Sequence, residues 1–108
     1  MVDDEALAEL RQVCAGAAVV SEAGQTFIDL PGLRFIAVAE SVVRDALLTL
    51  QAHSGYPSRL FLSAPVSGRG QNWKAQTVLG RTWHSPSWGN VPPGRPIEML
   101  LQHLKVYK

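Results

Sequence analysis

Apolar side chains near the N-terminus recur at intervals of three and four residues. They are Leu7, Leu10, Val13 and Cys14. This spacing places them on one face and predicts a helix over residues 3–15. Asp3 or Asp4 can cap its start, because a short carboxylate accepts hydrogen bonds from the first free amides, and Gly16 is suited to end it. Cys14 lies on the apolar face, so we expect a buried thiol rather than a nucleophile.

Residues 17–38 consist of short apolar runs separated by turn residues. The runs are 18–20, 26–30 and 33–38. Turns are expected at residues 22–24 and at the Pro31-Gly32 pair, because glycine and proline interrupt regular elements. The pattern predicts two or three antiparallel strands.

Residues 39–52 fit two structures. Val42, Val43, Ala46, Leu47 and Leu50 would lie on one face of a helix. Ala46, Leu48 and Leu50 also alternate with polar residues, as in a strand, and periodicity cannot decide in so short a run. After a turn at residues 54–57, residues 60–63 predict a short strand that ends at Pro65.

Residues 64–95 are rich in proline and glycine and hold all three tryptophans of the chain. Such a composition predicts an irregular segment, with a short strand within residues 72–79, and the tryptophan rings are expected to anchor it to the body of the protein.

The last element is a predicted helix that begins at Pro96, where a missing amide costs nothing. Its apolar stripe consists of Ile97, Leu100, Leu101 and Leu104. Lys105 and Lys108 suit the negative end of the helix dipole, and we expect His103 on the exposed side. Together the elements predict a single α+β domain over residues 1–108: an N-terminal helix, an antiparallel meander of about four strands, an irregular tryptophan-rich segment and a C-terminal helix.

Composition narrows the class of protein. The 108 residues are 46% apolar and 18% charged, which favours a folded domain over disorder. No apolar run approaches the ~20 residues of a membrane span, and the acidic N-terminus is unlike a signal peptide, so we expect a cytoplasmic protein without a membrane partner. The single cysteine excludes an internal disulfide and a multi-cysteine zinc site.

Charge is distributed unevenly along the chain. Residues 1–54 carry three arginines and eight acidic residues, whereas residues 55–108 carry seven cations and one acid. If the halves form separate faces, the molecule is a dipole that can steer an acidic partner. The alternative is that the halves attract each other inside one fold.

The densest group of candidate functional residues lies between Gly80 and Asn90. It contains Arg81, Trp83, His84, Ser85, Trp88 and Asn90. The functional interpretation is a binding rim with aromatic walls and a titratable imidazole, in which His84 is the candidate catalytic residue. The structural interpretation is a loop anchored by its tryptophans, which we favour for the tryptophans themselves. Because the histidines are not spaced for a helical metal site, we expect no metal and no cofactor.

Two local patterns resemble the ubiquitin-conjugating (UBC) fold, and more closely its divergent prokaryotic members in bacterial ubiquitin-like modification operons. Residues 45–57 followed by 60–65 look like the strand, Gly-Tyr-Pro turn and strand of that family. Residues 83–88 followed by 96–107 look like its tryptophan-rich segment and closing helix. The resemblance implies that residues 45–52 are a strand, and it implies a modifier, an activating enzyme or a conjugating subunit as partner.

The chain departs from that family at its reactive residue. The family's conjugating enzymes carry a cysteine after the meander that accepts the modifier as a thioester, whereas this chain has no cysteine after Cys14 and no His-Pro-Asn motif. Thioester transfer needs a thiolate nucleophile. The resemblance therefore implies a non-catalytic or atypical protein-binding component.

Two alternatives remain at this point. One is a small enzyme in which His84 acts as general acid or base with Ser85, Ser87 or Asn90 nearby. The other is a nucleic-acid-binding domain that uses the cations and tryptophans of the second half, although these cations form no cluster.

Overall fold

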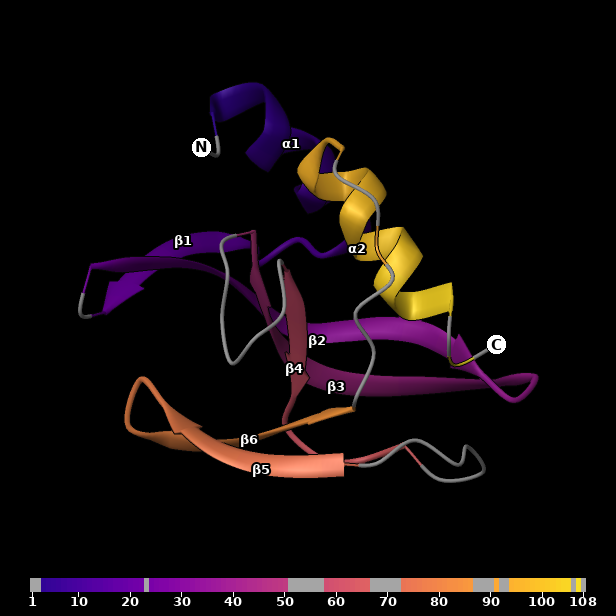
Figure 1. Cartoon of the computed structure of the whole chain (residues 1–108). Coiled ribbons are helices and arrows are strands. Elements are labelled where there is room, and N and C mark those ends of the chain that lie inside the picture. The colour runs from indigo at the N-terminus through magenta and orange to yellow at the C-terminus, as the bar shows by residue number, and fades with distance from the viewer. Residues whose placement is uncertain are drawn as a thin grey trace.

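The computed structural model describes residues 3–22, 24–50, 58–66, 73–86, 91, 94–105 and 107. Its elements are α1 (Asp4–Val13), β1 (Ala18–Glu22), β2 (Gln25–Ala37), β3 (Glu40–Thr49), β4 (Arg59–Leu62), β5 (Trp73–Val78), β6 (Arg81–Pro86) and α2 (Pro96–Lys105). The strands form an antiparallel sheet in the order β1-β2-β3-β4-β6-β5. Both helices lie over one face of this sheet (Figure 1).

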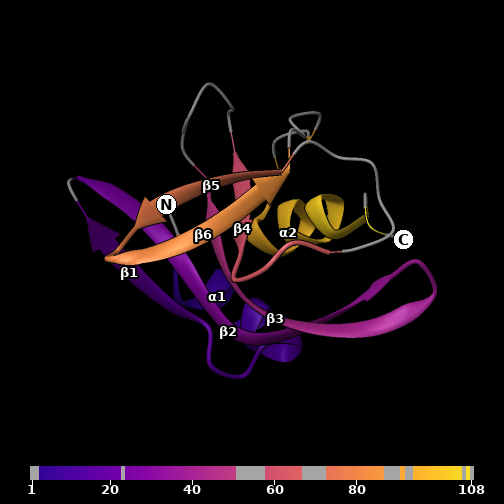
Figure 2. The ribbon, with the colours of Figure 1, turned by 90° about the horizontal axis from the view of Figure 1, so that it is seen from below.

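The α+β class is confirmed, but the sheet of about four strands is wrong, because the described residues form six. The two additional strands are β5 and β6, which form a hairpin on the side of the sheet away from the helices (Figure 1; Figure 2 shows the hairpin from below). β5 matches the short strand expected within residues 72–79, whereas β6 lies where an irregular segment was expected. Pairing with β5 along its whole length supplies the backbone hydrogen bonds that composition alone did not reveal.

The Pro31-Gly32 pair does not end a strand. β2 continues through it, with a shift of register against β3 between Leu30 and Leu33. Gly32 has a φ of 64°, and its amide donates to Asp45 Oδ1 at 2.8 Å. A bulge accommodates a proline because it needs no ladder hydrogen bond there. The turn expected at residues 31–32 is therefore a bulge that bends one long strand.

Of residues 39–52, Glu40–Thr49 form the strand β3, so the strand interpretation is correct over this stretch and the helix interpretation is wrong. Four consecutive residues of β3, Ala46–Thr49, are buried. The helices cover one face of the sheet at this point and the β5–β6 hairpin covers the other. A strand buried on both faces loses its alternation of polar and apolar residues, which explains why periodicity did not distinguish it from a helix.

Two apolar clusters lie on the two faces of the sheet. The larger one joins the helices to the sheet through Leu10, Ile28, Leu30, Leu48, Leu60, Leu62, Leu100, Leu104 and Tyr107, among others. The smaller one lies under the β5–β6 hairpin and consists of Phe27, Leu47, Phe61, Val78 and Trp83. Trp83 is buried, and its indole Nε1 donates to the carbonyl of Val78 at 3.1 Å. The anchoring role expected for this tryptophan is confirmed.

The start of the N-terminal helix follows its prediction, but the helix ends earlier than Gly16, at Val13, with Cys14 as its C-cap. Asp3 is the N-cap and accepts from the amide of Ala6 at 2.7 Å. Cys14 follows the helix and is buried, as expected. The side chains of Glu9 and Arg95 form an ion pair that ties α1 to the start of α2. Glu98 accepts from the Arg95 amide at 2.8 Å, which satisfies one of the free donors at the start of α2.

The orientation of α2 differs from the prediction. Its buried residues are Met99, Leu100, His103 and Leu104, whereas Leu101 is 52% exposed. His103 was expected on the exposed side but is only 3% exposed, because α2 packs against β4 and the imidazole forms a hydrogen bond with the Ser58 hydroxyl. Ser58 Oγ lies 3.0 Å from His103 Nε2. Burial lowers the pKa of His103 to about 4.

Some expected features lie outside the described residues: the turn at 54–57, His53, Ser87, Trp88 and Asn90. In the part of the chain that is described, neither helix is long and apolar enough to cross a membrane.

The turn between β2 and β3 is strained. Ala37 pairs with Glu40, so Val38 and Ala39 form a two-residue turn, and their φ values are 49° and 64°. Such turns favour Asn-Gly, because other L-residues pay a steric cost in the left-handed region. We expect Val38→Asn combined with Ala39→Gly to raise the free energy of unfolding by about 1 kcal/mol in urea denaturation. Gly80→Ala, at a φ of 72° in the β5–β6 turn, should lower the free energy of unfolding. A double variant that is less stable than the wild type, or a Gly80→Ala variant that is more stable, would contradict this interpretation.

Buried His103 should make stability depend on pH. The unfolded chain takes up a proton near pH 6.5 and the folded chain only near pH 4, so the free energy of unfolding should fall by roughly 3 kcal/mol as pH drops through this window. Below pH 4 both states are protonated and this loss stops growing. The carboxylates also titrate here, so the measurement is the difference between the wild type and His103→Gln. Equal pH slopes for the two proteins would contradict the prediction.

Candidate functional site

Arg81, the first residue of the predicted rim, lies on the surface of β6. Its guanidinium forms an ion pair with Asp45 (3.1 Å) and lies 4.7 Å from the centre of the Trp83 ring. The Gly32 amide, and after it Arg81, hold the pKa of Asp45 below its usual range. Arg81 therefore connects β6 to the bulge of β2, through Asp45 on β3.

His84 and Ser85 do not form one site. Successive residues of a strand point to opposite faces, so these two side chains diverge. His84 is half-buried and lies between its cross-strand neighbours Leu62 and Ala75. Ser85 is fully buried, and its hydroxyl has no hydrogen-bond partner in the structure as described. An acid-base mechanism that joins these two neighbours receives no geometric support.

The six predicted binding residues thus separate into three groups. Arg81 and His84 reach the surface at least in part, and Trp83 and Ser85 are buried. Trp88 and Asn90 lie outside the described residues, so the structure does not place them.

Three of the five described cations of the second half are paired with the first half or buried. Arg81 pairs with Asp45, and Arg95 pairs with Glu9 and approaches Glu5 at 4.0 Å. Arg59 is 2% exposed, with its guanidinium 5.8 Å from the centre of the Phe61 ring. These contacts favour attraction between the two halves inside one fold over a separate basic face.

Cys14 is positioned against the bulge of β2. Its Sγ–H donates to the carbonyl of Pro31 at 3.2 Å, and burial raises the pKa of the thiol. A raised pKa and an enclosed sulfur both disfavour the thiolate that acyl transfer requires. Among the described residues, no three histidine, cysteine or acidic side chains are grouped as metal ligands.

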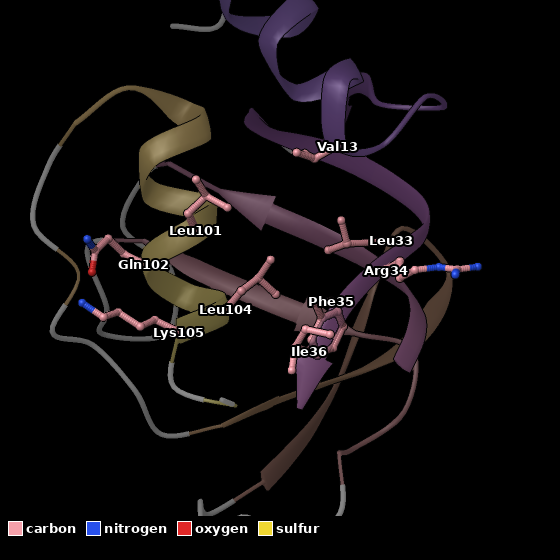
Figure 3. A pocket seen from close by; sticks show the side chains of 9 residues that line it. All are labelled: Val13, Leu33, Arg34, Phe35, Ile36, Leu101, Gln102, Leu104 and Lys105. Carbon is pink, nitrogen blue, oxygen red and sulfur yellow. The ribbon is translucent and has the colours of Figure 1, made fainter. Parts of the chain in front are cut away.

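A groove lies between the end of α1, β2 and α2 and has a volume of about 440 Å³ (Figure 3). Its lining residues are Val13, Leu33, Arg34, Phe35, Ile36, Leu101, Gln102, Leu104 and Lys105. Leu33, Phe35 and Leu104 are buried and form the floor. The groove is thus a depression over the larger core and is large enough for part of a ligand or peptide.

Exposed apolar side chains gather at this groove. Val13 is 43% exposed, Ile36 44% and Leu101 52%, and all three line it. They account for half of the large apolar residues that are exposed in the described part of the chain, the others being Val19, Val38 and Val43. A local concentration of this kind is typical of a surface that another molecule covers.

The charged residues of the groove share one sign. Arg34 and Lys105 are both exposed, and the described lining contains no acidic side chain. Figure 3 shows Lys105 on the outer side of α2 and Arg34 pointing away from the helix, so the two cations flank the apolar surface. Such a surface complements an apolar molecule with negative charge at its borders.

Sequence reasoning did not find this groove. It assigned Val13 and Leu101 to buried helix faces, and both are exposed because the helices pack with Leu10 and Leu100 toward the sheet. One signal was present: the apolar stripe of the last helix is wider than one packing face requires, and Leu101 lies at its border.

Comparison of the chain with models of protein families, with curated proteins and with solved structures gives no match.

Proposed function

We propose that this chain is a protein-recognition module with a UBC-like layout, and that it binds a component of a bacterial ubiquitin-like modification pathway without carrying the modifier on sulfur. The observation that carries the recognition function is the groove, where Val13, Ile36 and Leu101 are exposed around a buried apolar floor. A cluster of exposed apolar side chains rimmed by polar residues is typical of a surface that binds another protein.

Two further observations support the proposal, one for the UBC-like layout and one for the absence of thioester transfer. α1 is followed by β1, β2, β3 and β4 in consecutive antiparallel order, which agrees with a helix and meander at the start of that layout. The lone thiol is enclosed between α1 and the bulge of β2, which favours recognition over thioester transfer. The β5–β6 hairpin would then occupy the region after the meander.

Affinity purification from the native host tests the proposed pathway. The tagged chain should enrich a ubiquitin-like modifier, its activating enzyme or a conjugating subunit relative to an unrelated tagged protein of similar size. Mass spectrometry of the eluate identifies these components. Repeated enrichment of none of them would contradict the assignment to such a pathway.

The state of Cys14 provides a second test. In the folded protein its thiol should react with a disulfide reagent at least about a hundredfold more slowly than in denaturant, because burial and a raised pKa suppress the thiolate. Cys14→Ala should retain binding of the purified partner. A modifier adduct that forms on Cys14 with ATP and activating enzyme, and that a reducing agent releases, would contradict a non-catalytic role.

A further inference from the structure

The outer half of β2 has a free edge beside the groove. β1 pairs with β2 only from Gln25 to Asp29, whereas β3 accompanies β2 as far as Ala37. Beyond the bulge, β2 therefore has a neighbouring strand on one side only among the residues that the structure describes. Unpaired backbone groups on such an edge are a template for another strand.

The register shows which backbone groups point to this edge. In a two-residue hairpin turn the closing residues, here Ala37 and Glu40, exchange hydrogen bonds with each other. Hydrogen-bonded and non-hydrogen-bonded pairs then alternate, so the N–H and C=O groups of Ile36 and Arg34 point away from β3. Val38 confirms this direction, because its amide donates outward to the carbonyl of Tyr107 at 2.8 Å.

The lining of the groove agrees with this register. Four consecutive residues of β2, 33–36, line it. Side chains alternate between the two faces of a strand, so a cavity above one face touches every second residue, whereas a cavity along the edge touches all of them. The groove therefore follows the open edge of β2, with α2 along its other side (Figure 3).

We propose that the groove binds an extended segment of a partner protein, which adds to β2 as a further strand and alternates apolar with acidic residues. This inference rests on the proposed recognition function and specifies its site and ligand. Side chains of the added strand that point toward the helices would meet Val13 and Leu101, which requires apolar residues. Those on the other face would lie beside Arg34, which favours acidic residues.

The length of the added strand is limited. The contact between Val38 and Tyr107 occupies the edge at the β2–β3 turn, and the bulge at residues 31–32 ends it on the other side. The pairing groups of Arg34 and Ile36 lie between these limits. A segment of about five residues covers this distance at ~3.4 Å per residue.

The test uses the whole chain and a synthetic heptapeptide, acetyl-Glu-Val-Glu-Val-Glu-Val-Glu-amide, in an NMR titration. We expect saturable binding that shifts the amide resonances of Arg34 and Ile36 and slows their hydrogen exchange. A peptide with lysine in place of every glutamate should bind at least about tenfold more weakly, because Arg34 and Lys105 repel it. Every second residue of the added strand directs its amide toward β2. N-methylation of that set of peptide amides should abolish binding, whereas N-methylation of the other set should leave binding intact.

Matched variants locate the site. Leu101→Asp and Arg34→Glu should each weaken binding of the glutamate peptide at least about tenfold. Val19→Asp on β1 replaces an apolar residue with an acidic one, and Lys74→Glu on β5 replaces a basic residue with an acidic one. Both positions are exposed and do not line the groove, so these variants should leave the affinity unchanged. Circular dichroism of each variant checks that the fold is retained, and Leu101→Ser replaces Leu101→Asp if that variant does not fold.

Three outcomes would overturn the proposal. The first is that the heptapeptide shows no saturable binding, and the second is that both sets of variants weaken binding equally. The third is that the chain sediments as a dimer that Leu101→Asp dissociates, because a second copy of the chain would then occupy the groove. If a pathway component purified from the host still binds Leu101→Asp and Arg34→Glu with wild-type affinity, the recognition function stands and this site for it fails. If no such component is found but the heptapeptide binds as expected, the site stands and the pathway assignment fails.

Discussion

The fold depends on the burial of β3 and β4 on both faces. Leu48 and Leu60 face the helices, while Leu47 and Phe61 lie in the smaller cluster with Trp83. A chain of this size has one modest core, and here the sheet divides it into two layers, each of which needs its own cover. The β5–β6 hairpin is the cover of the second layer, so the tryptophan-rich half of the sequence completes the core of the first half.

The sequence was sufficient where one residue type determines the local structure. Asp3 as a helix cap, the glycine turn at residue 24 and Pro96 at the start of α2 were all predictable from local chemistry. It was insufficient where the outcome depends on contacts between distant segments. The bulge at Pro31-Gly32 exists because Asp45 accepts the Gly32 amide, and β6 exists because β5 pairs with it.

The candidate site shows the same division. Local pattern identified Trp83 as an anchor and Cys14 as a buried thiol, because both follow from side-chain chemistry. It could not predict that His103 faces Ser58, or that Leu101 faces solvent, because these depend on the rotation of α2 about its axis against the sheet. Neighbouring residues of a helix differ by about 100° around its axis, so a rotation by one position exchanges a buried for an exposed side chain. The apolar stripe of α2 is broader than the surface that packs on the sheet, so the sequence alone does not determine which of its residues are buried.

Asp45 gives the molecule an internal connection between its two layers. Its carboxylate holds the bulge of β2 through Gly32 and holds β6 through Arg81, whose guanidinium stacks on Trp83. A shift of the outer half of β2 would therefore move the carboxylate, loosen the stacked guanidinium and change the electric field at the indole. In a chain that carries Trp73→Phe and Trp88→Phe, the emission of Trp83 would therefore report movements of β2 on the opposite side of the sheet.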